Sequence, residues 1–241
     1  MPAPPAPLSS PVRLEVACFD HASALAAARA GADRLELCVG AREGGLTPSR
    51  ALVEAVREAV AVPLAVMVRT RGGDFCFSGD EHALMRRDLR QLREAGADAF
   101  VWGALLPSGE IDTAALHAFV EAADGTSVAF HRAFDAAPDP FAALDTLADA
   151  GVVRVLSAGG LGTAAEGASR LAALVRHAAG RLVVMPGGGV RASNVRALVA
   201  ETWATDVHSA ARRRAAPGHP HGDMRDEADP AEVAALVAAL R

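Results

Sequence analysis

The segment AVMVRTRGGDF changes abruptly from apolar residues to charged ones. Its first part is typical of a buried strand, but Arg69, Arg71 and Asp74 follow without a polar transition. The two glycines between them permit a sharp turn of the backbone. Arginine presents a planar fork of donors that suits carboxylates and phosphates. We therefore predict a ligand-binding loop in which Arg69 and Arg71 are directed at a common ligand.

Acids and histidines occur in or just after other apolar runs of the sequence. Glu15 and Glu36 interrupt runs that are otherwise apolar, and His131 follows another such run. Carboxylates and imidazoles are the usual groups for general acid–base chemistry, so we interpret these three residues as catalytic candidates. The candidates for ligand binding are Arg69, Arg71, Asp74, Arg132, Asp135, Ser157, Gly188, Gly189 and His208.

The elements that must position these residues repeat in a regular order. Each β-rich run is followed by a turn and a helical pattern, as at 21–30, 48–60, 80–95 and 230–240. Strands that alternate with helices require crossovers and form a parallel sheet. The predicted strands cover residues 13–18, 33–38, 63–69, 98–103, 127–132, 154–159, 181–188 and 205–210.

Eight such units in a chain of 241 residues predict a single (β/α)8 TIM barrel over residues 12–241. An open, doubly wound sheet is the alternative. Gly31, Gly96 and Gly151 precede predicted strands and are expected to end helices.

In a TIM barrel, active sites lie at the C-terminal ends of the strands. The candidate residues fall at or near those ends, whereas the opposite loops contain only ordinary turn residues. Burial of unpaired charge is unfavourable, so this asymmetry predicts a functional site at one rim. The alternative is a structural charge layer in which Glu15 and Glu36 pair with Arg69 and Arg132.

The segment MPGGGV follows the seventh predicted strand. TIM barrels often bind phosphate with the loops after strands seven and eight. We therefore expect Gly188 and Gly189 to present backbone N–H groups to an anion. Ser193 is expected to be the N-cap of the next helix.

Composition restricts the class of protein. The net charge of −5 and the absence of a long basic run argue against a general nucleic-acid binder. No apolar run reaches the roughly 18 residues of a membrane span, so no membrane segment is expected. Residues 1–11 are rich in proline and alanine, which predicts a disordered leader and not a secretory signal.

Three cysteines, Cys18, Cys38 and Cys76, form no disulfide framework and fit a reducing cytoplasm. His219 and His221 could chelate a metal, but their polar surroundings favour an exposed loop. The run of arginines at 212–214 is interpreted as a solvated or interface segment.

Seven segments, taken in order, resemble the CutC family of copper homeostasis proteins. The resemblance implies a cytoplasmic TIM barrel that takes part in copper homeostasis by binding or handling Cu(I), and a homo-oligomer. The matching segments are GADRLELC (31–38), EGGLTPS (43–49), RTRGGDF (69–75), FHRAFD (130–135), VLSAGG (155–160), MPGGGV (185–190) and VHSAAR (207–212).

The sequence departs from the family pattern at two positions. Thr70 replaces a proline in the family's Arg-Pro-Arg segment, and Ala17 stands where members with a proposed copper site have a cysteine. Cys38 is therefore the first metal-ligand candidate, with Cys18 or Cys76 as its partner. Strand residues alternate between two faces, which places Cys38 inside the barrel and Cys18 toward the helices. This geometry predicts weak Cu(I) binding, because Cu(I) favours soft thiolate ligands.

Three interpretations remain open from the sequence. The first is a copper-handling protein, as the resemblance implies. The second is a barrel enzyme that acts on a small anionic molecule, with phosphorylated metabolites included in that class. The third is a barrel that binds such a ligand without catalysis.

Overall fold

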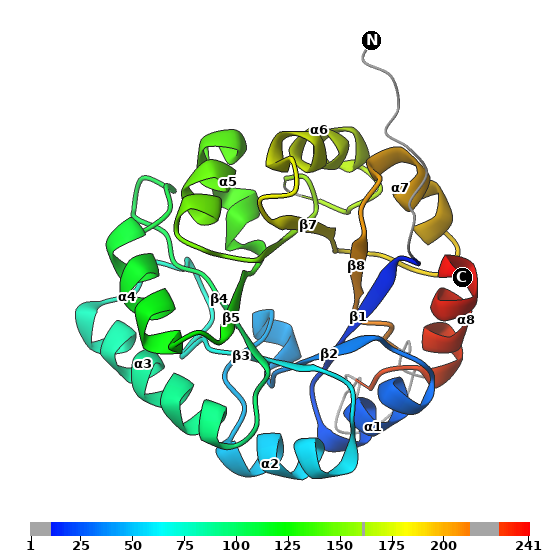
Figure 1. The fold of residues 1–241 in the computed structure, drawn as a ribbon, viewed down its shortest axis with the longest axis horizontal. Coiled ribbons are helices and arrows are strands. Elements are labelled where there is room, and N and C mark those ends of the chain that lie inside the picture. The colour runs from blue at the N-terminus through cyan, green and yellow to red at the C-terminus, as the bar shows by residue number, and fades with distance from the viewer. Residues whose placement is uncertain (1–10, 161, 213–226) are drawn as a thin grey trace, which may run out of the picture.

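The computed structural model describes residues 11–160, 162–212 and 227–241, and its strands form one parallel sheet. Strands β1 to β7 pair in sequence order, and β8 pairs with β1. Because β7 and β8 lie next to each other, the sheet curves into a barrel (Figure 1). The strands are β1 (Arg13–Cys18), β2 (Arg34–Leu37), β3 (Leu64–Met67), β4 (Ala99–Trp102), β5 (Ser127–Phe130), β6 (Arg154–Ser157), β7 (Val183–Pro186) and β8 (Asp206–Ser209).

Helices follow the strands and form a ring outside them, which confirms the predicted (β/α)8 TIM barrel (Figure 1). Two short 3₁₀ helices, η1 (Ala41–Glu43) and η2 (Arg132–Ala136), lie in the loops after β2 and β5. The α-helices are α1 (His21–Arg29), α2 (Arg50–Ala59), α3 (Gly79–Glu94), α4 (Thr113–Ala123), α5 (Pro140–Asp149), α6 (Ala168–Ala178), α7 (Val195–Thr202) and α8 (Pro230–Leu240).

Local sequence signals explain most helix ends. Ser78 and Glu81 form a reciprocal capping box at the start of α3, which satisfies two backbone N–H groups. Positive φ angles follow the C-terminal ends of α1, α3 and α5, as predicted, at Gly31, Gly96 and Gly151. The expectation for Ser193 is wrong: α7 begins at Val195, so Asn194 occupies the N-cap position.

The strands bury different residues on their two faces. Outward residues such as Leu14, Val16 and Leu35 pack against the helices in the main core cluster. Burial of each such side chain stabilises the fold by about 1.5–3 kcal/mol. The inward cluster is smaller and consists of Cys38, Ala65, Met67, Ala99, Val101 and Ala129. Small inward side chains leave space inside the barrel for the polar residues described below.

Several predictions concern residues that the structure does not describe. These residues are 1–10 of the predicted leader and the segment that contains Arg213, Arg214, His219 and His221. Within the described ranges, no helix is both long enough and apolar enough to traverse a lipid bilayer.

Candidate functional site

The C-terminal ends of the strands surround a cavity of about 500 Å³. It is lined by residues from β1, β2, β3, β6 and β8 and by the loops that follow β1, β2, β3, β5, β7 and β8. Its polar and charged lining residues are Glu36, Glu43, Arg69, His131, Arg132, Asp135, His208 and Arg212. Most of the predicted site residues therefore share one cavity, whereas Glu15, Arg71, Asp74 and Ser157 are absent from its lining.

Glu15 lies just below the cavity and is fully engaged by other residues. Its Oε1 is 2.8 Å from His208 Nδ1, and its Oε2 accepts a hydrogen bond from Arg34 Nε. Arg34 also forms an ion pair of 3.2 Å with Asp206. The charge-layer alternative named the wrong partners, because Glu15 pairs with Arg34 and His208 and not with Arg69 or Arg132.

Glu36 has the same side chain as Glu15 but a different environment. Its Oε2 lies 3.9 Å from His208 Nε2, and its buried Oε1 has no hydrogen-bond partner among the described residues. Burial and the nearby charge of Glu15 raise the pKa of Glu36 to about 7, against the opposing charge of His208. The pKa of Glu15 is instead lowered to about 2. Burial by itself would raise this pKa, but the hydrogen bonds and charges of His208 and Arg34 outweigh the effect of burial.

His131 faces the cavity as a neutral hydrogen-bond donor. Its Nδ1 accepts a hydrogen bond of 3.2 Å from the backbone N–H of Ala133, so a neutral ring carries its proton on Nε2. Burial and the charge of Arg69 lower the pKa of His131 to about 3, which favours the neutral ring. The buried Nε2 has no hydrogen-bond partner in the described part of the chain.

A glycine makes room for the ring of His131. A Cβ atom at Gly103 would lie 2.5 Å from His131 Cε1, so the ring could not keep its position beside a larger residue without a rearrangement. A Cβ atom at Gly187 would meet Leu156 Cδ1 at 2.4 Å and His208 Cβ at 3.2 Å.

Arg69 and Arg71 diverge, although the sequence suggested a common target. Arg69 is buried and lines the cavity, where it donates to the Glu43 carbonyl oxygen at 2.7 Å and stacks on Phe75. Arg71 is 41% exposed and donates to Glu81 at 2.6 Å. It also pairs with Asp74, which is 68% exposed. The structure therefore places Arg71 and Asp74 outside the cavity lining.

Arg132, Asp135 and Ser157 form a connected group at the edge of the cavity. Arg132, which was predicted to end the strand, belongs with Asp135 to η2, and their side chains meet at 2.8 Å. Asp135 also accepts hydrogen bonds from the Ser157 hydroxyl at 2.6 Å and from the backbone N–H of Ala158. Ser157 and Asp135 thus fix the loop after β6, while Arg132 lines the cavity beside Gly188.

In the loop after β7, the carbonyl oxygens of two glycines accept hydrogen bonds from nearby residues of the same chain. Gly188 O accepts from the N–H of Ala164, and Gly189 O accepts from the side chain of Asn194. The N–H groups of Gly188 and Gly189 donate to no other group in the described residues. Both glycines line the cavity and have positive φ angles of 102° and 74°.

The three cysteines do not form a joint site. Cys18 lies in the core between strands and helices, whereas Cys38 belongs to the inward cluster. Cys76 packs against the outer core and is absent from the cavity lining. Burial, followed by nearby carboxylates, raises the pKa of both Cys18 and Cys38. The structure therefore places the two proposed copper ligands on opposite sides of the wall.

Sequence reasoning missed Arg34 and Asp206. Arg34 pairs with Glu15 and with Asp206, which joins three strands in one network. The available signal was strand alternation: these residues precede Glu36 and His208 by two positions and share their faces. Arg212 was interpreted as part of a solvated or interface segment, yet it lines the cavity and stacks on Phe19 at 4.7 Å.

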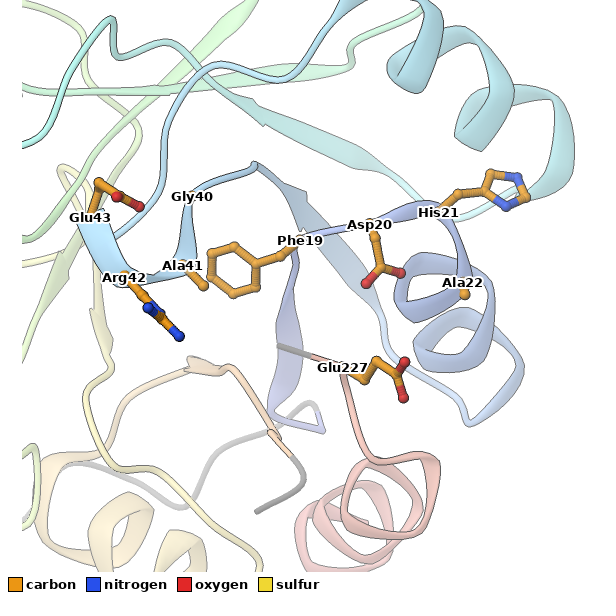
Figure 2. A pocket seen from close by; sticks show the side chains of 9 residues that line it. All are labelled: Phe19, Asp20, His21, Ala22, Gly40, Ala41, Arg42, Glu43 and Glu227. Atoms are coloured by element: carbon orange, nitrogen blue, oxygen red, sulfur yellow. The ribbon is translucent and has the colours of Figure 1, made fainter. Parts of the chain in front are cut away.

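A second hollow of about 700 Å³ adjoins the cavity between the loops that follow β1 and β2 (Figure 2). It includes Asp20, His21, Arg42 and Glu227 and shares Glu43 with the cavity. Although this hollow is larger than the cavity, size alone does not make it the better candidate for the functional site. The buried atoms of Glu36 and His131 that lack a partner among the described residues belong to the smaller cavity.

The chain is similar to proteins of one family over most of its length. The CutC family model matches residues 12–213. A family protein CutC from Xylella fastidiosa (strain 9a5c) is 46% identical over 215 residues, 88% of this chain and 80% of that protein. The human copper homeostasis protein cutC homolog is 43% identical over 199 residues, 83% of this chain and 73% of that protein.

Solved structures that are similar to this chain include a member of the same family and other TIM barrels. The crystal structure of a copper homeostasis protein CutC from Streptococcus agalactiae matches with a TM-score of 0.79 and 31% identity, covering 83% of this chain and 98% of that one. Phosphoribosylanthranilate isomerase from Thermotoga maritima matches with a TM-score of 0.60 and 12% identity over 95% of this chain and 98% of that one, which shows the fold alone. With its matching family model, its similar relatives and its TIM-barrel fold, this chain belongs to the CutC family.

Proposed function

We propose that this CutC-family protein takes part in copper homeostasis, and that its molecular activity is to bind a small anionic metabolite in the cavity. The first part follows the name of the human relative. The second part depends on one observation: buried donors that find no partner among the described residues share one cavity with arginine side chains. A cytoplasmic location and a homo-oligomeric state, both implied by the resemblance, belong to the same proposal.

The anion would lie between Arg132 and the loop after β7. The N–H groups of Gly188 and Gly189 donate to no group in the described ranges, and their carbonyl oxygens accept hydrogen bonds from Ala164 and Asn194. Backbone N–H groups combined with a guanidinium are a common arrangement for phosphates and carboxylates. Phosphorylated metabolites are therefore the class that matches this part of the cavity best.

The remainder of the ligand would contact His131 and Arg69. The Nε2–H of His131 is a neutral donor, which suits a carbonyl or hydroxyl oxygen of the ligand. Of the acid–base candidates, His131 and Glu36 line the cavity, whereas Glu15 acts on His208 from below it. We propose that His131 and Glu36 contact the ligand and that Glu15 positions His208.

Thermal-shift measurements with inorganic phosphate, sulfate and a set of sugar phosphates test the proposal. We expect these anions to raise the melting temperature of the wild-type protein. Arg132→Gln should weaken phosphate binding by about 10–100-fold, because a hydrogen bond to a charged group is typically worth about 1.5–3 kcal/mol.

Arg71→Gln provides the matched control, since Arg71 belongs to the same rim but lies outside the cavity lining. It should bind phosphate like the wild-type protein. Equal binding by Arg132→Gln and the wild-type protein would contradict the proposed anion site, as would the failure of all these anions to bind.

A further inference from the structure

Three side chains below and within the cavity are arranged like part of a metal centre. Possible ligand atoms of Glu15, Glu36 and His208 all lie within 4.8 Å of one another. These residues are only 2%, 4% and 8% exposed, respectively. They come from three neighbouring strands, and the parallel register of β1 and β8 aligns Glu15 directly with His208.

Glu36 provides an independent indication of a missing partner. Its Oε1 is buried in the cavity lining and accepts no hydrogen bond from any residue that the structure describes. A carboxylate oxygen without a partner is unfavourable in such an environment, because desolvation removes its hydrogen bonds with water. A cation bound at Glu36 would replace those interactions.

His208 is oriented by a carboxylate in the way that metal-bound histidines usually are. Glu15 Oε1 lies 2.8 Å from His208 Nδ1, so the ionised carboxylate holds a proton on that nitrogen. The other nitrogen, Nε2, is directed toward Glu36. A carboxylate on the distal nitrogen fixes the tautomer of a metal-binding imidazole and increases its basicity. Arg34 in turn holds Glu15.

We propose that Glu36 and His208 bind a divalent transition-metal ion, with Glu15 supporting His208 and the cavity side of the ion open to water or ligand. One imidazole nitrogen and carboxylate oxygens suit ions such as Zn²⁺ and Co²⁺, whereas Cu(I) prefers sulfur ligands. This site requires neither the cysteines nor a bound anion, so it goes beyond the proposed function.

The distance between the two ligands is compatible with this assignment. His208 Nε2 and Glu36 Oε2 are 3.9 Å apart. Zinc bonds of about 2.0–2.2 Å place two ligand atoms of one tetrahedral ion roughly 3.4 Å apart. A small rotation of the Glu36 carboxylate would close the difference.

Titration with Co²⁺ and Zn²⁺ in a buffer without phosphate tests the site, using visible absorption for Co²⁺ and calorimetry for Zn²⁺. We expect one ion per chain in the wild-type protein and at least a tenfold loss of affinity in His208→Gln and in Glu36→Gln. Glu15→Gln should weaken binding by about 10–100-fold, as is typical when the support of a metal ligand is removed.

Three controls identify the site that binds the ion. Cys38→Ser tests for thiolate binding inside the same barrel, His117→Gln removes an exposed histidine, and His219→Gln/His221→Gln removes the histidine pair near the C-terminus. All three should retain wild-type affinity. Glu36→Gln removes a buried carboxylate with an unpartnered oxygen, so it should fold even if His208→Gln does not.

The proposal is overturned if the wild-type protein binds neither ion, or if Glu36→Gln binds as tightly as the wild-type protein. It is equally overturned if the only variant that loses binding is Cys38→Ser or the His219→Gln/His221→Gln pair. Phosphate binding by the metal-free protein is measured separately, so failure of the cation site leaves the proposed anion site standing, and the reverse also holds.

Discussion

Glu15 and Glu36 show how neighbouring side chains determine the role of a residue. Both are buried glutamates that face the barrel interior from adjacent strands. Glu15 forms hydrogen bonds through both oxygens with Arg34 and His208, whereas one oxygen of Glu36 has no partner in the part of the chain that the structure describes. The first residue is thereby suited to positioning, and the second is suited to contact with a ligand or ion.

At the same scale, the positions of the thiols predict weak Cu(I) binding. Cys18 and Cys38 lie in different core clusters on opposite sides of the strand wall. Two sulfurs in these positions cannot share an ion unless the backbone rearranges. We expect Cys18→Ser to change Cu(I) affinity little, as measured by competition with a calibrated Cu(I) chelator under anaerobic conditions. Tight stoichiometric binding that is lost in both Cys18→Ser and Cys38→Ser would disprove this expectation.

At the scale of elements, the ends of β4 and β5 determine the position of His131. Gly103 follows β4, and the space that its missing side chain leaves is occupied by the imidazole ring. His131 in turn caps η2 through the N–H of Ala133. One glycine therefore links two neighbouring strand ends to a residue of the cavity.

We expect Gly103→Ala to displace His131, because the new Cβ would lie 2.5 Å from its ring. Overpacking of this kind typically destabilises a protein by about 1–3 kcal/mol. Urea unfolding measures that loss, and phosphate titration measures the accompanying loss of affinity. Gly79→Ala is the matched control, since a Cβ there meets no atom within 4 Å. Similar results for both variants would argue against the role of Gly103.

At the scale of the molecule, a buried charge network connects the first two strands to the last. Arg34 on β2 pairs with Glu15 on β1 and Asp206 on β8, and Asp206 also pairs with Arg13 at 2.8 Å. These strands are far apart in the sequence, so the network joins the beginning of the chain to its end. It also holds Glu15 below the cavity, and through Glu15 it holds His208 in the cavity lining.

Arg34→Met should destabilise the whole fold, because it leaves Glu15 and Asp206 buried without their shared cation. Breaking a buried pair in this way typically costs about 3–5 kcal/mol. The free energy of unfolding in urea provides the measurement. Arg50→Ala removes an exposed arginine that pairs with Glu54, and it should cost no more than about 1 kcal/mol. Equal losses in the two variants would show that the network contributes little to stability.

The sequence by itself determined the features that depend on local periodicity. Alternating strand and helix patterns predicted the barrel, and glycines predicted the ends of α1, α3 and α5. The two-residue period of a strand also separated Cys18 from Cys38, because successive side chains point to opposite faces. The barrel prediction in turn placed most of the acids and histidines at one rim, because active sites of TIM barrels lie at the C-terminal ends of the strands.

Only the tertiary structure decided which of those residues meet. Arg69 and Arg71 are two positions apart, yet one is held by the loop after β2 and the other by α3. The pairing of Glu15 with Arg34 and His208 likewise depends on strand register. Such contacts join segments that are distant in the sequence, and periodicity carries no information about the geometry of the loops and strands that bring them together.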